Sequence, residues 1–234
     1  GLCLRNDNNQ AGYYNLIYDN GGYIINDDKT KSGMDDPKTV EAMEMLEGWI
    51  KDGVLPPIET MSENGEDVLL ESGKVAMVPQ GSWMIAAFRD NEYTAENCDC
   101  VELPKSATTG RRASLYNGLG WAASANTEHP EEAWQLIEYL GSKEAQEKQA
   151  ELGVTMSAYT GTSEAWAKSA NFNLQAYINM MDDMEIRPYS RSTVTWENKN
   201  SEILKSVYSG DKTMADACKE MAEQMNESLA EEQQ

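Results

Sequence analysis

The side chains of this chain best suited to ligand recognition are aromatic ones with a polar edge. Its 234 residues include 6 Trp and 11 Tyr against 2 Phe. Trp and Tyr combine an apolar face with a polar group, which suits a ring with C–H groups on its faces and hydroxyls around its rim, such as a sugar. Trp83, Trp121 and Trp196 lie beside turns or at the ends of expected elements and are candidates for ligand contact. Trp49 and Trp134 fall at core positions of amphipathic patterns and are expected to pack.

Signals of catalysis or metal binding are poor in this sequence. His129 is the only histidine and stands just ahead of an expected helix, and no nucleophile elbow or phosphate-binding loop is present. The glycines at 118 and 120 lack the third glycine of a dinucleotide site. The 40 acidic residues leave a glycosidase pair possible by count, but none stands out. We therefore expect no catalytic residue, no metal and no cofactor.

Charge and cysteine content restrict the partners further. The net charge of −21 argues against nucleic acid and against anionic lipid as partners, because both need a basic face. No apolar run approaches the ~18 residues of a membrane span, and the opening "GLCLRNDNNQ" does not read as a signal peptide. The cysteines are too few for a disulfide scaffold, although one disulfide stays possible: Cys3, Cys98, Cys100 and Cys218.

Helix signals are clear over much of the chain. Asp36-Pro37 combines an N-cap acid with proline at the first helical position, and Gly53 follows the pattern. Thr213 caps a last amphipathic helix, and "AEEQQ" at the end reads as a frayed tail. Further helices are expected at 10–20, in "EDVLLESGK" and "SWMIAAFRD", on both sides of Gly141-Ser142, and at 163–184 and 193–208.

Short strands are expected between these helices. "KVAMVP" (74–79) and "CDCVELP" (98–104) are apolar runs bounded by turn residues, and "LYNGLGWAAS" (115–124) is glycine-rich and strand-like. Residues 58–67 are polar and acidic and are expected to form a loop. Short strands that alternate with helices indicate an α/β or α+β fold.

Six segments, in this order and spacing, resemble the extracellular solute-binding proteins of ABC importers, in the branch typified by maltose-binding protein. The resemblance covers nearly the whole chain and implies an α/β fold of the periplasmic binding protein type II class, helix-rich and mostly the C-terminal lobe. The segments are "YYNLIYDNGGYIIND", "DDPKTVEAMEMLEGWIKDGVLPP", "LLESGKVAMVPQGSWMIAAF", "VELPKS", "NGLGWAASANTEHPEEAWQLIEYLGSKEAQEKQAELG" and "SVYSGDKTMADACKEMAEQMNESL".

The resemblance also implies a ligand site. In this family the strand before "GSW" ends at the cleft between two lobes, and the aromatic after the turn stacks on a sugar ring, which is the position of Trp83. Gly81 allows a tight turn there, and Ser82 can cap the following helix. The further ligand contacts that it implies are Trp196, Trp121, Asn117, Tyr14, Tyr13, Ser82 and Arg191.

The same resemblance divides the chain and suggests a role. It implies a C-terminal fragment in which 1–103 and 159–234 form the C-terminal lobe, 104–111 connect the lobes, and 112–158 belong to the N-terminal lobe. The complete protein would capture a sugar, which we expect to be an oligosaccharide, outside the cell or in the periplasm. It would be tethered by lipid to the outer face of the membrane and would deliver the sugar to an ABC permease. Two alternatives stay open: a carbohydrate-active enzyme, and a non-transport interaction or sensing module on the same fold.

Overall fold

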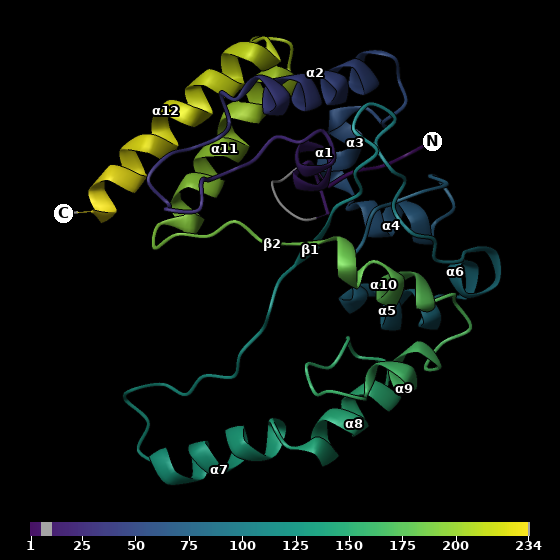
Figure 1. Cartoon of the computed structure of the whole chain (residues 1–234). Helices are drawn as coiled ribbons and strands as arrows, with labels where there is room; N and C mark the ends of the chain where they lie inside the picture. The colour runs from purple at the N-terminus through teal and green to yellow at the C-terminus, as the bar shows by residue number, and fades with distance from the viewer. Residues whose placement is uncertain (6–10, 234) are drawn as a thin grey trace. The chain divides into compact units, whose positions relative to one another are not determined.

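Residues 1–5 and 11–233, which the computed structural model describes, form parts of two compact units (Figure 1). Unit 1 consists of 1–79, 103–116 and 182–234, and unit 2 consists of 80–102 and 117–181. The units do not coincide with the predicted lobes, since 80–102 group with 117–181. The predicted lobe boundaries concern a longer polypeptide and stay a prediction.

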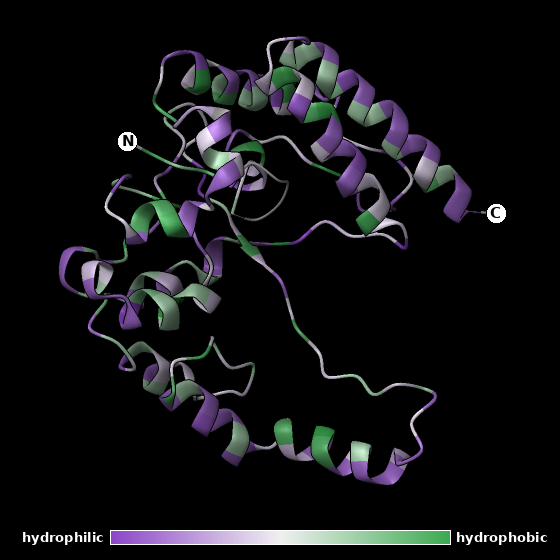
Figure 2. Ribbon diagram, turned by 180° about the vertical axis from the view of Figure 1, so that it is seen from behind, coloured by the Kyte–Doolittle hydropathy of each residue, from purple (hydrophilic) through white to green (hydrophobic). Residues whose placement is uncertain are grey.

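The core of unit 1 is built mainly from helices. They are α1 (Tyr14–Asp19), α2 (Pro37–Lys51), α11 (Thr193–Tyr208) and α12 (Met214–Glu232). Figure 1 shows α11 and α12 side by side, and α2 contacts both of them. The predicted apolar side of α12 is confirmed, because each of its members is completely buried: Met214, Ala217, Cys218, Met221 and Met225. Figure 2 shows hydrophilic residues elsewhere along the same helix.

The predicted helix starts of unit 1 are confirmed by their capping hydrogen bonds. The Asp36 carboxylate accepts the N–H of Lys38, with Pro37 at the first helical position of α2. The Thr213 hydroxyl oxygen accepts the N–H of Asp216 in the first turn of α12. These oxygens satisfy backbone donors that have no partner inside the helix.

Two short helices lie between α2 and residue 80, where the chain first enters unit 2. They are α3 (Ile58–Glu63) and α4 (Glu66–Glu71). The expectation of a loop at 58–67 is therefore wrong for most of its length. Glu59 in the first turn of α3 interacts favourably with the helix dipole, and the surrounding acidity is compatible with a helix start.

The sheet of unit 1 has two parallel strands, β1 (Ser114–Tyr116) and β2 (Met184–Ile186). Ser114 pairs with Met184, and the Arg187 N–H continues the ladder to the Tyr116 carbonyl at 2.9 Å. The strand predicted at 74–79 is wrong apart from one bridge between Met77 and Leu2, and no strand forms at 98–104. A strand needs a neighbouring strand to which its backbone can hydrogen-bond. Among the described residues, the segments 74–79 and 98–104 have no such neighbour along their length.

The strand-like pattern at 115–124 is confirmed only at its start. Residues 117–123, which follow β1 directly, take part in no backbone hydrogen bond with any described residue. Alternating apolar residues thus reproduce a strand pattern without the neighbouring strand that would complete it.

Unit 2 consists of short helices joined by turns. They are a 3₁₀ turn, η1 (Ser82–Met84), followed by α5 (Ile85–Asp90), α6 (Glu92–Asn97), α7 (Pro130–Leu140), α8 (Lys143–Glu151), α9 (Ser163–Ala167) and α10 (Gln175–Asn179). Its core holds the buried Trp166, whose ring meets that of Tyr177 edge-on at 5.6 Å between centroids. The break predicted at Gly141-Ser142 is confirmed, with Ser142 capping α8.

The single helix predicted at 163–184 is wrong. The chain forms α9 and α10 there, then a second 3₁₀ turn, η2 (Met181–Asp183), and β2. Ser and Asn residues between α9 and α10 favour turns, because their side chains compete for backbone hydrogen bonds.

Among the described residues, none of those in α7 is buried, although its sequence is amphipathic, and Figure 2 shows hydrophobic residues along this helix. Trp134 keeps 64% of its surface exposed, so the expectation that it packs in a core is wrong, whereas Trp49 packs against the core of unit 1. An amphipathic pattern predicts that a helix can bury one face but does not supply the surface that covers it. None of the helices in the described part of the chain is both long and apolar enough to cross a membrane.

Candidate functional site

Trp83 is the exposed aromatic of unit 2 whose orientation the backbone determines most directly. It keeps 45% of its surface exposed in the middle of the 3₁₀ turn η1. A Cβ atom on Gly81 would lie 2.0 Å from Cζ3 of the Trp83 ring, so the indole lies directly over the glycine backbone. Only glycine leaves room for this arrangement.

Ser82 supports the same turn, although not as a helix cap. Gly81 occupies the N-cap position and no side-chain cap forms, so the predicted capping role of Ser82 is wrong. Its Oγ lies 3.0 Å from the Oγ1 of Thr155, which follows α8 in the chain. The turn that carries Trp83 is thus joined to the segment after α8 within unit 2.

Asn117 and Trp121 belong to unit 2 as well, on the extended segment after β1. Both are exposed, and the Trp121 ring keeps 61% of its surface open. Exposure leaves their side chains accessible, and their role as ligand contacts stays a prediction.

Three of the predicted ligand residues lie in the core of unit 1. Trp196 and Tyr14 are completely buried, and Tyr13 is 1% exposed. The rings of Tyr13 and Tyr14 meet edge-on, with centroids 5.1 Å apart. These side chains leave no surface for a solute to contact in this structure, so we do not retain them as ligand contacts.

The buried aromatic residues instead support a surface segment. The Tyr14 hydroxyl donates a hydrogen bond of 3.0 Å to Oε1 of Glu197, and burial raises the pKa of Tyr14 well above its usual range. Arg187 donates from Nη2 to both oxygens of the same carboxylate at 2.6 Å. The Trp196 indole N–H donates to the Ser190 hydroxyl at 3.0 Å. Core aromatics and surface loop are therefore connected through polar contacts.

That loop, residues 187–192, borders a pocket of about 370 Å³ on unit 1. Tyr189 is 55% exposed there, and the Lys29 ammonium lies 3.3 Å from the centre of its ring. A hydrogen bond from Lys29 lowers the pKa of Tyr189, and the positive charge of Lys29 adds to the effect. The pocket lining consists of Asp28, Lys29, Tyr189, Ser190, Arg191, Glu232 and Gln233.

Arg191 is the one residue of this pocket lining that the sequence predicts as a ligand contact, and Tyr189 and Lys29 are two of the six that it does not. Tyr189 stands beside Pro188 in "RPYSR", ahead of a helix, which is the same signal of an aromatic at a turn that singles out Trp83. Lys29 carries no comparable signal, because its neighbourhood in the sequence is a plain polar turn. Its backbone adopts a positive φ of 56°.

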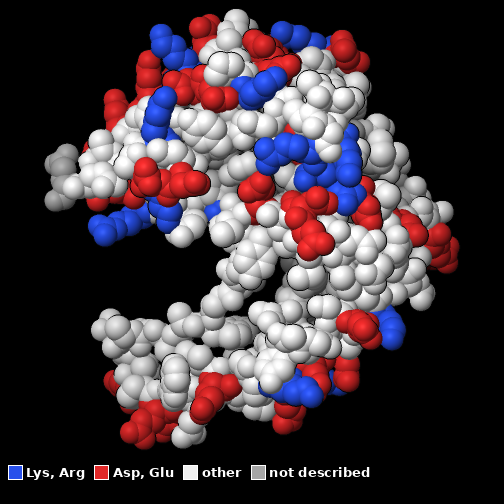
Figure 3. Space-filling view, viewed as in Figure 1, with Lys and Arg blue, Asp and Glu red and all other residues white. Residues whose placement is uncertain are grey.

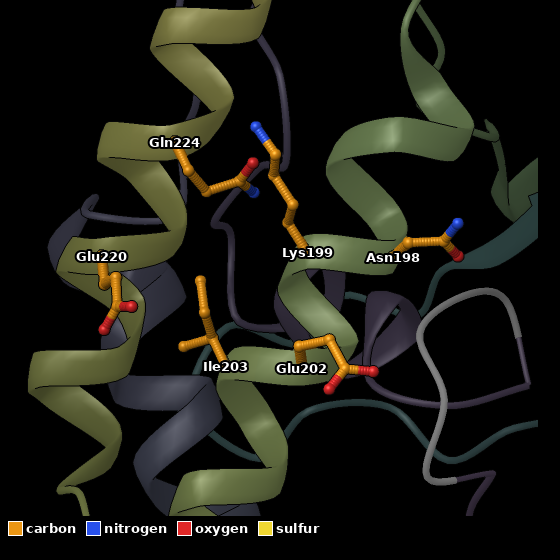
Figure 4. Close-up of a pocket in the computed structure, with 6 residues that line it drawn as sticks. All are labelled: Asn198, Lys199, Glu202, Ile203, Glu220 and Gln224. Atoms are coloured by element: carbon orange, nitrogen blue, oxygen red, sulfur yellow. The ribbon is translucent and has the colours of Figure 1, made fainter.

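A second depression, of about 400 Å³, follows the groove between α11 and α12 (Figure 4). Gln224 extends from α12 toward α11, where its amide donates to the Asn200 side chain at 2.7 Å. No aromatic residue lines this depression: Asn198, Lys199, Glu202, Ile203, Glu220 and Gln224. It therefore suits a ring-shaped solute less well than the pocket beside Tyr189.

The charges and thiols of the described residues form no metal centre. No group of three His, Cys, Asp or Glu side chains among them is placed to hold an ion, and all four cysteines are free thiols. Basic side chains lie next to acidic ones on the face seen in Figure 3. The ion pairs Arg111–Glu185 and Arg112–Asp183 join the segment just before β1 to β2 and the residue before it.

Comparison with known proteins extends this picture. A family model described as "Bacterial extracellular solute-binding protein" matches residues 5–181. The maltodextrin-binding protein MdxE of Bacillus subtilis is 26% identical over 135 residues, which are 55% of this chain and 31% of that protein.

Solved structures agree over nearly the whole chain. The GacH receptor of Streptomyces glaucescens matches with a TM-score of 0.85 at 19% identity, over 98% of this chain and 59% of its own. The substrate-binding protein Lmo0181 of Listeria monocytogenes, solved with cycloalternan, matches with a TM-score of 0.83 at 19% identity, over 98% of this chain and 58% of its own.

These matches confirm the predicted fold class, the type II fold of periplasmic sugar-binding proteins. The chain spans less than two thirds of the length of these relatives. The family model covers well over half of the chain. The chain therefore belongs to the family of bacterial extracellular solute-binding proteins.

Proposed function

We propose that this chain belongs to a binding protein that captures an oligosaccharide and delivers it to the permease of an ABC importer. The observation that carries the proposal is the exposed Trp83 indole, which lies flat against Gly81 with one face supported by backbone. An aromatic face held in this way can stack on the apolar face of a sugar ring without losing much conformational entropy on binding.

Further polar and aromatic groups of each unit are proposed ligand contacts. In unit 2 these are Trp121, Asn117 and Ser82, beside Trp83. In unit 1, taken by itself, they are Arg191 and Tyr189. Asn and Arg side chains suit the hydroxyl groups of a sugar. The ligands of relatives support an oligosaccharide: maltodextrin for MdxE, cycloalternan for Lmo0181, acarbose for GacH, and maltotriose for the MalE domain of Bdellovibrio bacteriovorus.

The proposal involves binding without covalent chemistry. The relatives are substrate-binding proteins, and we infer that this chain likewise is not an enzyme. The family is extracellular, and we further expect this protein to be attached by lipid to the outer face of the membrane.

The test is a titration of tryptophan fluorescence with maltotriose, maltohexaose, a cyclic glucan and cellotetraose. We expect saturation with an α-glucan, and a loss of affinity on the order of tenfold, or ~1.4 kcal/mol, in Trp83→Ala. Trp134→Ala is the matched control, because it also removes an exposed indole but is not among the proposed ligand contacts. Affinity that is equal in both variants would overturn the role of Trp83.

The two alternative functions give different results in the same samples. An enzyme would release reducing ends from the glucan over time, and one carboxylate variant would abolish that release. An interaction module would bind no sugar and would tolerate Trp83→Ala. Either outcome would contradict the transport proposal.

A further inference from the structure

The last turn of α12 ends in a carboxylate with an unusual number of donors. Glu232 accepts the backbone N–H of Arg191 at 3.0 Å and that of Ser192 at 2.7 Å. It also accepts the Ser190 hydroxyl at 2.7 Å, and the Ser192 hydroxyl donates to the same carboxylate oxygen. One side chain near the end of the chain thus satisfies four donors of the turn before α11.

This carboxylate also lies where the dipole of α11 favours negative charge. Ser192 is the N-cap residue of that 16-residue helix and makes no side-chain cap of its own. Partial burial opposes ionisation of Glu232, but the hydrogen bonds from Ser192, Ser190 and the backbone outweigh it and lower its pKa to about 2. The carboxylate therefore stays charged at neutral pH and takes the place of the side-chain cap that Ser192 does not form.

The same turn is held from beneath by the core. The Ser190 hydroxyl accepts the indole N–H of Trp196 while it donates to Glu232. The Ser190 N–H donates to the Thr193 hydroxyl at 2.7 Å. Trp196 is completely buried, so one side of the turn rests on a rigid group and Glu232 holds the other.

The turn carries the residues that border the pocket of unit 1. Tyr189 precedes it, Arg191 lies within it, and Glu232 lines the same pocket. The other charged groups of the lining are Asp28 and Lys29, on the loop opposite. The backbone amides at 191 and 192 are already occupied by Glu232, so a ligand meets the side chains of this turn and not its amides.

We propose that Glu232 is a positioning residue, which holds the Ser190–Ser192 turn and thereby orients Tyr189 and Arg191 toward a neutral, polyhydroxylated ligand. Its effect on ligand affinity rests on the function proposed above, whereas its hold on the turn does not. The two parts are therefore tested by separate measurements on the same variants.

The first measurement is limited proteolysis with trypsin, read by mass spectrometry. Trypsin cuts after Arg and Lys but not before proline, and Pro188 follows Arg187, so cleavage after Arg191 reports on this turn alone. We expect Glu232→Ala to raise the initial rate at Arg191 about tenfold relative to the rate after Lys105, because opening of the turn exposes the bond. Glu232→Gln, which keeps one carbonyl acceptor, should lie between.

Glu231→Gln is the matched control for these variants. Glu231 is the neighbouring residue on α12, and its exposed side chain makes no hydrogen bond or ion pair with any described residue. This control changes the net charge in the same way as Glu232→Gln, and we expect no change at Arg191. An Arg191 cleavage rate that is equal in wild type and Glu232→Ala would overturn the proposal.

The second measurement is a double-mutant cycle on sugar affinity, with Glu232→Ala, Tyr189→Ala and their combination. If Glu232 acts by orienting Tyr189, Glu232→Ala weakens binding about tenfold in wild type and much less in Tyr189→Ala. Losses that simply add would show a general structural effect and would overturn the positioning role. A wild type that binds no sugar would refute the proposed function, while the protease result would still decide whether Glu232 holds the turn.

Discussion

Arg187 and Glu197 join the end of the sheet to the first turns of α11. One guanidinium nitrogen of Arg187 lies 2.6 Å from each oxygen of the Glu197 carboxylate, and the Tyr14 hydroxyl donates to the same group. The Glu197 side chain is 6% exposed and that of Arg187 is 28% exposed. The carboxylate thus depends on these two partners, since little water reaches it.

Removal of the Glu197 carboxylate should therefore destabilise unit 1. Breaking a buried pair costs ~3–5 kcal/mol, and we expect the lower end for Glu197→Ala because Arg187 is partly solvated. Urea denaturation measures the change. The exposed pair Lys205–Glu202 provides the control, and Glu202→Ala should change stability by less than ~0.5 kcal/mol. Equal effects of the two substitutions would contradict a special role for the buried pair.

Asp19 predicts a pH-dependent stability. Its carboxylate accepts the N–H of Ala113, and burial raises its pKa from 3.8 to about 6, against the opposing effect of that hydrogen bond and of Arg111 and Arg112. A raised carboxyl pKa means that folding favours the protonated form. Wild-type stability should therefore fall as the pH rises through the window from about 4 to about 6, compared with a variant that cannot ionise.

Asp19→Asn is that variant, because its amide oxygen can still accept the Ala113 N–H. The melting temperature of Asp19→Asn minus that of wild type should become more positive between pH 4 and pH 7, as measured by circular dichroism. Asp182→Asn, at an exposed position of the same unit, is the control. A difference that is constant over this range, or that shrinks with rising pH, would show that burial of Asp19 carries no ionisation cost.

Gly81 should affect sugar affinity only by leaving room for the Trp83 ring. Alanine at position 81 would place a methyl carbon 2.0 Å from the indole, so the ring must leave its position. We expect Gly81→Ala to weaken sugar binding about as much as Trp83→Ala, on the order of tenfold. Calorimetric titration measures this loss, with circular dichroism to verify the fold.

Gly48→Ala is the matched control for this substitution. Gly48 lies inside α2, where an added methyl group meets no atom within 4 Å. It should stabilise the helix by up to ~1 kcal/mol and leave affinity unchanged. If Gly81→Ala bound sugar as tightly as wild type, the orientation of Trp83 over Gly81 would be irrelevant to binding.

The two tryptophans Trp134 and Trp166 should differ sharply in their contribution to stability. Trp166 is completely buried in the core of unit 2, and Trp166→Ala should cost ~3–5 kcal/mol. Trp134 is 64% exposed on α7, and Trp134→Ala should change stability by ~0.5 kcal/mol or less. Chemical denaturation followed by circular dichroism compares them. A large loss in Trp134→Ala would mean that the face of α7 is covered in solution.

The sequence by itself predicts the features that depend on local chemistry. The helix starts at Asp36-Pro37, Ser142 and Thr213 follow from residues next to each other, because a cap needs only its own first turn. The apolar side of α12 follows from periodicity alone. Family membership also follows from the sequence itself, because the family model matches residues 5–181.

Tertiary structure decided the features that need a partner from elsewhere in the chain. Strands at 74–79 and 98–104 fail because a strand exists only beside another one, and Trp134 stays exposed because no described residue covers it. Trp196 and Tyr14 have the residue type of a ligand contact, but their burial depends on how α1, α2, α11 and α12 pack into one core. The hold of Glu232 on the Ser190–Ser192 turn spans 40 to 42 residues of sequence, and no local pattern encodes such a contact. Local hydrogen bonds and periodicity can be read along a chain, whereas burial and long-range pairing depend on how its segments pack together.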